Sequence, residues 1–211
     1  MKNIFLIRDL AHQAFGKNAF EHGLFYLHER SLRFELSVEG SFVELFNQAL
    51  SKGIEILDNV FGKQNDLYAC VSFYGGKGLL ANLSIFKQLK SLDIELNKSS
   101  CEIWQEPYPQ EENDDLEKNY FRTFIIFPIG RTEMLSLLWS AVASDFNISP
   151  RVSAHIYFFS SKLQILAHPY DDRGMDIIGA NHDLKQMLFD CFNNYLLDYD
   201  LKIMNKNFIK R

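Results

Sequence analysis

The sequence predicts an α+β fold in which a mixed, mostly antiparallel sheet carries packed helices. Three observations lead to this fold class. Aromatic residues are abundant, with 19 Phe, 9 Tyr and 2 Trp, and large rings favour strands over a helical bundle. Segments with helical spacing of apolar residues are interspersed with short apolar runs typical of strands. Finally, three such runs between residues 152 and 179 are joined by turns so short that the strands must run antiparallel.

The elements of the first half follow from local pattern. Residues 32–38 alternate apolar and polar side chains, which is typical of a strand with one buried face. Ser41 and Glu44 form a capping-box pattern before a long amphipathic helix that Gly62 should end. Helices are expected over 3–15, 42–61 and 83–92, and strands over 24–27, 32–38, 66–74 and 101–108.

The second half begins with an apolar run, 120–129, that predicts a central strand buried on both faces. A helix over 131–147 follows. Strands over 152–159, 163–170 and 175–179 then form a three-stranded meander. Asn181 should cap a long final helix whose apolar stripe extends to Leu196. We expect a single domain over residues 1–211, because no linker or repeat divides the 211-residue chain.

Composition argues against several partners and compartments. The formal net charge is −5 and the pI is about 5.7, so the surface as a whole repels nucleic acid and acidic membranes. The apolar run at the N-terminus breaks at Arg8, too early for a secretory signal, and no segment is apolar enough to span a membrane. Cys70, Cys101 and Cys191 are few and far apart, as in reduced thiols. These features predict a cytoplasmic protein without direct nucleic-acid or membrane binding.

An acidic loop is expected as an insertion at about 106–119, because this segment combines two prolines with many carboxylates before the first basic residue, Lys118. A solvated loop is one interpretation. The other is an acidic arm that meets a basic partner, as charge blocks often do. In the second interpretation the partner-binding carboxylates are Glu106, Glu111, Glu112, Asp114, Asp115 and Glu117.

Two further patterns are candidates for small-molecule chemistry. The Gly75–Gly78 loop follows a strand, but it lacks the Ser or Thr that completes a phosphate-binding P-loop, so an ordinary turn is expected. His155 and His168 should come close across a hairpin, and His182 lies beside Asp183. Because a metal needs three or four convergent ligands and the spacing does not force convergence, we predict no metal site and no cofactor.

The sequence shows no signature of a catalytic nucleophile such as Gly-x-Ser-x-Gly. We therefore expect no catalytic residues and a protein that is not an enzyme. A small-molecule-binding domain or an orphan enzyme, using Gly75–Gly78 or the His155 and His168 region, remains the alternative.

The segment Tyr170–Gly174, Tyr-Asp-Asp-Arg-Gly, is the most specific pattern in the chain. A structural role accounts for it: Asp171 can accept backbone amides two residues on, and Gly174 can close the turn in a left-handed conformation. Arg173 can pair with one of three carboxylates, which are Asp171, Asp172 and Asp176. In the competing interpretation, Asp172 and Arg173 present a rigid charged knob to a partner, since arginine is common at interface hot spots.

These residues, followed by Met175-Asp176-Ile177-Ile178, resemble the signature of an uncharacterised bacterial family known by its Tyr-Asp-Asp-Arg-Gly motif. The resemblance extends over roughly residues 150–200 and more loosely to Phe121-Arg122-Thr123-Phe124. Members resemble immunity proteins of contact-dependent growth inhibition and other polymorphic toxin systems. The resemblance implies an immunity protein, or antitoxin, that neutralises a cognate toxin domain, expected to be a basic nuclease. An interaction module unrelated to toxins is a third possibility.

Overall fold

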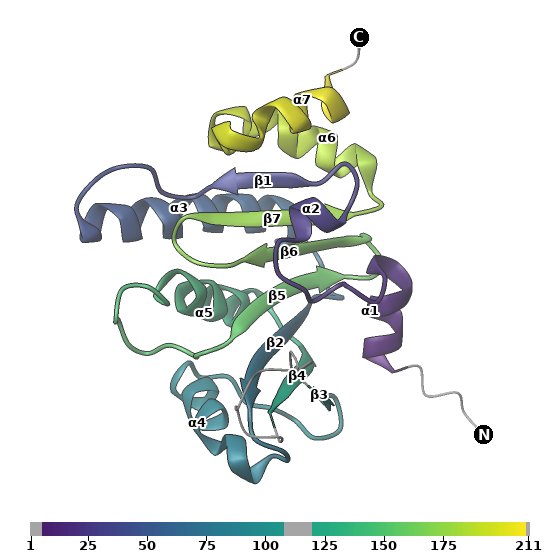
Figure 1. Cartoon of the computed structure of the whole chain (residues 1–211), viewed down its shortest axis with the longest axis vertical. Coiled ribbons are helices and arrows are strands. Elements are labelled where there is room, and N and C mark those ends of the chain that lie inside the picture. Colours follow the sequence, from purple (N-terminus) through teal and green to yellow (C-terminus); the bar gives the residue numbers. More distant parts are fainter. Residues whose placement is uncertain (1–5, 108–119, 210–211) are drawn as a thin grey trace, which may run out of the picture.

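The computed structural model describes residues 6–107 and 120–209. Seven strands form one sheet in the order β1-β7-β6-β5-β2-β4-β3, and every pairing between them is antiparallel (Figure 1). The predicted α+β class is confirmed. The strands are β1 (Leu32–Glu35), β2 (Tyr68–Gly75), β3 (Glu102–Pro107), β4 (Phe121–Pro128), β5 (His155–Ser160), β6 (Ile165–Pro169) and β7 (Gly174–Gly179).

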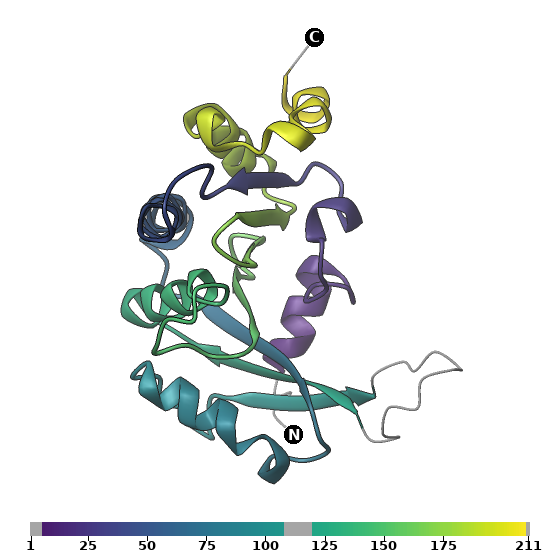
Figure 2. The ribbon, with the colours of Figure 1, turned by 60° about the vertical axis from the view of Figure 1, so that its left-hand side comes forward.

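Helices cover both faces of this sheet (Figure 2). They are α1 (Ile7–Phe15), α2 (Leu24–Leu27), α3 (Phe42–Phe61), α4 (Leu83–Ser91), α5 (Arg131–Val142), α6 (His182–Cys191) and α7 (Leu201–Phe208). Side chains of β5 alternate between two cores, as the period of a strand requires. Ile156 and Phe158 join the large core beneath α3 and α5, whereas Tyr157 and Phe159 join the smaller core beneath α1. The smaller core lies on the face that carries the candidate site.

Local signals placed several elements correctly. Ser41 Oγ accepts from the amide of Glu44, and Glu44 Oε2 accepts from the amide of Ser41 at 2.8 Å, so the predicted capping box starts α3. The meander β5-β6-β7 is also present. The helix predicted after it begins as expected, as α6 capped by Asn181, but it ends at Cys191 and does not extend to Leu196. Two short 3-10 turns then lead into α7.

Residues 24–27 were predicted as a strand, and this is wrong: they form the single helical turn α2. Gly23 adopts a left-handed conformation with φ 62°, which turns the chain before the helix begins. The amide of Phe25 is donated to the Asp176 carboxylate, Oδ2, at 3.0 Å and not to a neighbouring strand. A buried tertiary acceptor therefore outweighs the strand propensity of this apolar segment.

The strands β5 and β6 separate at one end. Their register runs from Ser160↔Ile165 to Phe158↔Ala167, whereas β6 stays paired with β7 as far as Pro169↔Met175. Beyond Phe158 the carbonyl oxygen of Ile156 is 2.9 Å from a ring nitrogen of His168. The divergence of the two strands leaves room for side chains at this end of the sheet.

We expect Gly174→Ala to destabilise the protein by about 2–3 kcal/mol, as overpacking of a filled site does. Gly174 is not left-handed, so that part of the prediction is wrong. A Cβ there would collide with the Tyr170 hydroxyl and lie 2.9 Å from the carbonyl oxygen of Phe34. Urea unfolding measures the change. The control is Gly130→Ala, whose new Cβ would meet only the flexible end of Glu133, and a similar loss in both variants would contradict the packing argument.

Lys185 is a fully buried cation on α6. Its Nζ donates to the carbonyl oxygen of Arg30 at 2.8 Å, and burial lowers its pKa from 10.5 to about 8. Between pH 8 and 10.5 the unfolded chain then binds more protons than the folded one, so stability rises with pH in this window. We expect Lys185→Met to stabilise the protein near pH 7 and this gain to shrink by about 2 kcal/mol between pH 8 and 10. Urea unfolding at both pH values tests this; exposed Lys206→Met is the control, and a gain independent of pH would contradict it.

Candidate functional site

A cavity of about 760 Å³ lies beside the separated ends of β5 and β6. Its wall combines imidazoles, charged groups and the Tyr170–Gly174 turn, called the motif turn below. The lining residues are His22, Gly23, Arg33, Glu35, Ser37, Val38, His155, His168, Tyr170, Asp171, Arg173, Asp176 and Leu197. A concave site with several convergent polar groups is the expected form of a ligand-binding site.

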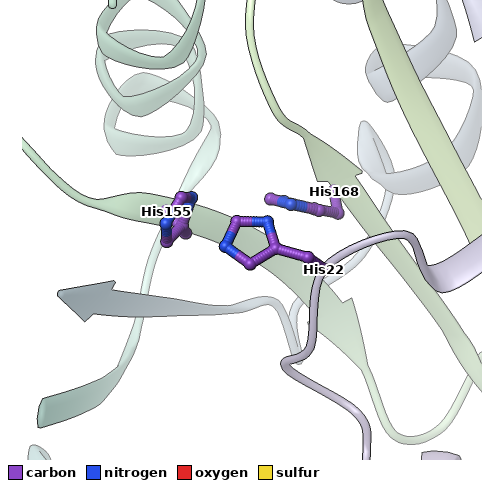
Figure 3. Close-up of side chains that lie close together, drawn as sticks. All are labelled: His22, His155 and His168. Carbon is purple, nitrogen blue, oxygen red and sulfur yellow. The ribbon is translucent and has the colours of Figure 1, made fainter. Parts of the chain in front are cut away.

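Three histidines converge at this cavity (Figure 3). His22 comes from the segment between α1 and α2, His155 begins β5, and His168 lies in β6. The ring centroids are 4.0 Å apart for His22 and His155, 6.2 Å for His22 and His168, and 6.3 Å for His155 and His168. Each ring offers one nitrogen that lies within 4.8 Å of the other two.

Strand alternation explains why two of these rings face the same way. His155 lies two residues before Tyr157, and His168 two residues after Leu166; Tyr157 and Leu166 both belong to the core beneath α1. His168 stacks on the Tyr157 ring at a centroid distance of 4.1 Å. His22 approaches from the loop that crosses this face, so the sheet supplies two rings and the crossing loop the third.

His168 is held in an orientation suited to ligation. It is 1% exposed, and its Nδ1 lies 2.9 Å from the carbonyl oxygen of Ile156. Because a carbonyl oxygen only accepts, Nδ1 carries the proton and Nε2 keeps its lone pair. Nε2 is buried and has no hydrogen-bond partner among the described residues. Metal-binding histidines commonly donate their second ring nitrogen to a backbone carbonyl in this way.

The three imidazoles are held in the neutral form that binds metals. Burial lowers the pKa of His155 and of His168 to about 3 and also lowers the pKa of His22. The nearby Arg122 guanidinium adds to each shift; its Nη1 is paired with Glu21 at 2.8 Å. Zinc–nitrogen bonds of 2.0–2.1 Å place ligand nitrogens about 3.4 Å apart. Modest ring rotations would therefore bring these three donors around one ion.

The motif turn forms one edge of the cavity. Asp171 Oδ1 accepts from the amide of Arg173 at 2.8 Å, and Oδ2 accepts from Arg173 Nε at 2.8 Å and from Nη2. The predicted Asp171 turn and the pairing of Arg173 are confirmed. Asp172 is buried and accepts from Ser37 Oγ at 3.1 Å, and burial raises its pKa. Arg173 is thus presented to solvent, whereas Asp172 is not part of an exposed knob.

Asp176, another lining residue of the cavity, connects several elements of the fold. Arg33 on β1 makes a bidentate pair with it, Nε to Oδ1 at 2.7 Å and Nη2 to Oδ2 at 3.0 Å. The remaining guanidinium nitrogen, Nη1, contacts Asp200 Oδ2 at 3.1 Å. Asp176 is fully buried and also accepts from Phe25, so it joins α2, β1 and β7. This carboxylate was a possible partner for Arg173, but it pairs with Arg33.

The other sequence candidates lie outside this cluster. Asn82 and Gln105 occupy the polar groups of the Gly75–Gly78 loop: Asn82 donates to the carbonyl oxygens of Gly76 and Gly78, and Gln105 accepts from the amide of Gly78. This is an ordinary turn. His182 begins α6 and is exposed.

Of the acidic arm, only Glu106 falls within the described residues, where Oε1 accepts from Trp104 Nε1 at 3.0 Å. The other five carboxylates lie outside them: Glu111, Glu112, Asp114, Asp115 and Glu117.

His22 is the site residue that sequence reasoning missed. It lies 133 positions before His155 and 146 before His168, in a loop without a motif. The only available signal was the number of histidines, six in the chain, which cannot identify a convergent trio. Arg33 is one of the polar positions of the alternating segment 32–38, a pattern that predicts a strand but no site residue.

Fold and site together define an α+β protein with a polar, histidine-lined pocket beside a Tyr-Asp-Asp-Arg-Gly turn. The chain belongs to the family described as a domain of unknown function, DUF3885, whose model matches residues 7–200. No curated protein and no solved structure matches the chain. Across the described residues, no helix is both long and apolar enough to cross a membrane.

Proposed function

We propose that this protein binds a divalent transition-metal ion through His22, His155 and His168, and that the adjoining cavity admits a small ligand to the ion. The observation that carries the proposal is the orphaned Nε2 of His168, buried and close to two further imidazoles. A buried polar atom without a partner costs about 1–3 kcal/mol. A bound ion would remove that cost.

The donor set favours zinc among common ions. Three neutral imidazoles suit zinc, copper or nickel, whereas magnesium and calcium prefer oxygen donors. Catalytic zinc sites typically use three protein ligands and keep one position for water or substrate, whereas structural sites use four. The histidine trio matches the three-ligand class.

Isothermal titration of the chelator-treated protein with Zn²⁺ tests the proposal. We expect one equivalent to bind and Mg²⁺ to produce no heat. The protein as purified after expression without added metal, before any chelator treatment, should contain a transition metal in a ratio near one. Failure to bind Zn²⁺, Co²⁺ or Ni²⁺ at any stoichiometry would remove the proposal.

A second candidate function is immunity against a cognate toxin, as the motif resemblance implies. Its structural support is an apolar hollow of about 480 Å³ in which Phe42 and Val43 are 79% and 70% exposed. Exposed apolar patches of this kind often mark protein interfaces. Its other lining residues are Phe46, Trp139, Asp145, Phe146 and Ile148. The formal charge of −5 also suits a basic nuclease as partner.

Co-purification with a candidate toxin domain, sought among the neighbouring genes, tests this second function. At physiological salt we expect a one-to-one complex that Phe42→Asp disrupts. Leu80→Asp, at an 84% exposed leucine of the segment before α4, serves as the control and should leave the complex intact. The absence of any complex with the unaltered protein would exclude immunity through that toxin. In this function the protein acts by binding and performs no catalysis.

A further inference from the structure

The histidine site also has features that identify the class of its ligand. We infer that the bound ion keeps one coordination position open to the cavity and that an anionic oxygen, from a carboxylate or phosphate group, fills it while contacting Arg173. This inference rests on the proposed metal site. It specifies what the metal is for, since a purely structural ion would leave no position for a ligand.

The open position follows from the number and placement of donors. Among the described residues, the only group of three or more potential metal ligands that lies close enough together is His22, His155 and His168. All three line the cavity, and His22 is exposed. A four-coordinate zinc ion at this trio therefore keeps one position that no His, Cys, Asp or Glu of the described residues fills, and the space beside it is the cavity.

The charges of the cavity and of the bound ion indicate the sign of the ligand's charge. The charged lining groups are two arginines and three carboxylates, and Asp200 pairs with the lining Arg33, so these groups together carry two negative charges. Arg122 is balanced by its pair with Glu21. Neutral imidazoles do not reduce the charge of the ion, so a divalent metal neutralises the cavity and places two positive charges at its histidine end. The empty cavity thus attracts a cation, and the bound ion attracts an anion.

Arg173 is the lining cation that can meet this anion. Arg33 already pairs with Asp176 and Asp200, and its side chain is only 11% exposed. The Arg173 side chain is 73% exposed. Its Nε and Nη2 donate to Asp171, whereas Nη1 makes no hydrogen bond to the described residues. The pair with Asp171 holds the guanidinium in place and leaves donors directed away from that pair, as bidentate anion recognition by arginine requires.

The cavity is larger than an inorganic anion needs. Its volume of about 760 Å³ falls within the range of sites for drug-sized or metabolite-sized molecules. The anionic oxygen is therefore one end of a small organic ligand. Acetate and inorganic phosphate serve as minimal probes for the two sources of such an oxygen.

Cobalt substitution provides a direct test, because the visible absorption of Co²⁺ reports its coordination number and geometry. The Co²⁺-loaded protein, freed of excess metal, is titrated separately with acetate and with inorganic phosphate. We expect a saturable spectral change with at least one probe. Arg173→Gln should bind that probe roughly tenfold more weakly, the loss of about one charge-assisted hydrogen bond, while still binding one equivalent of cobalt. A preference for phosphate or acetate identifies which group the natural ligand carries.

Arg131→Gln is the matched control, because Arg131 is an exposed arginine paired with Asp58 outside the cavity. Its titration should coincide with that of the unaltered protein. If cobalt binds but neither probe changes the spectrum, the open anion position is refuted and the metal site stands. Equal probe affinity in Arg173→Gln and the unaltered protein would refute the role of Arg173. Failure to bind cobalt at all would refute both this inference and the metal site.

Discussion

We expect His168→Ala to weaken zinc binding by well over a hundredfold. Altering residues that merely orient a ligand already costs tenfold to a hundredfold in metal affinity, and removing a ligand costs more. His168 should be the most sensitive of the three, because its Nδ1 bond to Ile156 fixes the ring before the ion arrives. Isothermal titration of the chelator-treated variant measures the loss.

Two further variants distinguish the loss of a metal ligand from misfolding of the protein. His168 is buried, so its replacement also disturbs the core, whereas His22 is exposed and His155 is half-buried. We expect His22→Ala and His155→Ala to lose zinc affinity while remaining folded by circular dichroism. His182→Ala, at an exposed histidine outside the cavity, is the control. Undiminished affinity in both His22→Ala and His155→Ala would show that the ion does not bind at this trio.

Asp176→Asn should lower the free energy of unfolding by about 3–5 kcal/mol, the usual cost of breaking a buried ion pair. The substitution leaves the Arg33 guanidinium without its bidentate partner and weakens the acceptor for the amide of Phe25. Urea denaturation with an unchanged m-value would identify the loss as one of stability.

The matched control for Asp176 is Asp58→Asn. Asp58 pairs bidentately with Arg131, with Nε to Oδ1 at 2.8 Å and Nη2 to Oδ2 at 2.7 Å, but the pair is exposed. Exposed pairs contribute about 0–1 kcal/mol. If Asp176→Asn and Asp58→Asn lowered the free energy of unfolding by similar amounts, burial would not explain the contribution of Asp176 to stability.

The resemblance and the structure indicate different roles for the Tyr-Asp-Asp-Arg-Gly turn. The resemblance implies immunity, and toxin binding remains a proposal. In the structure the turn lines the cavity with Tyr170, Asp171 and Arg173, and the ion pair of Asp176 and Arg33 lines it as well. The turn therefore stabilises the site and supplies two of its charged groups, Asp171 and Arg173. The proposed metal-dependent ligand pocket would account for the buried ion pair of Asp176 and for the exposed Arg173 without an additional partner.

Elements defined by contacts close in sequence could be predicted from the sequence. The capping box of Ser41 and Glu44, the Asp171 turn and the β5-β6-β7 meander each depend on residues a few positions apart or on short connections. Hydrophobic periodicity then indicates which faces are buried. The approach of His155 and His168 also followed from the hairpin, and the ring centroids are 6.3 Å apart.

Only the tertiary structure decided the rest. Residues 24–27 form a helix because Asp176, some 150 positions later, accepts the amide of Phe25, and Gly174 is required by the distant carbonyl of Phe34. His22 completes the histidine trio from a loop that carries no pattern of its own. Periodicity describes how a segment meets the core, but it contains no information on which distant segment it meets. The fold class was therefore determined by the sequence, and the candidate site by the packing of α1 and α2 against the sheet.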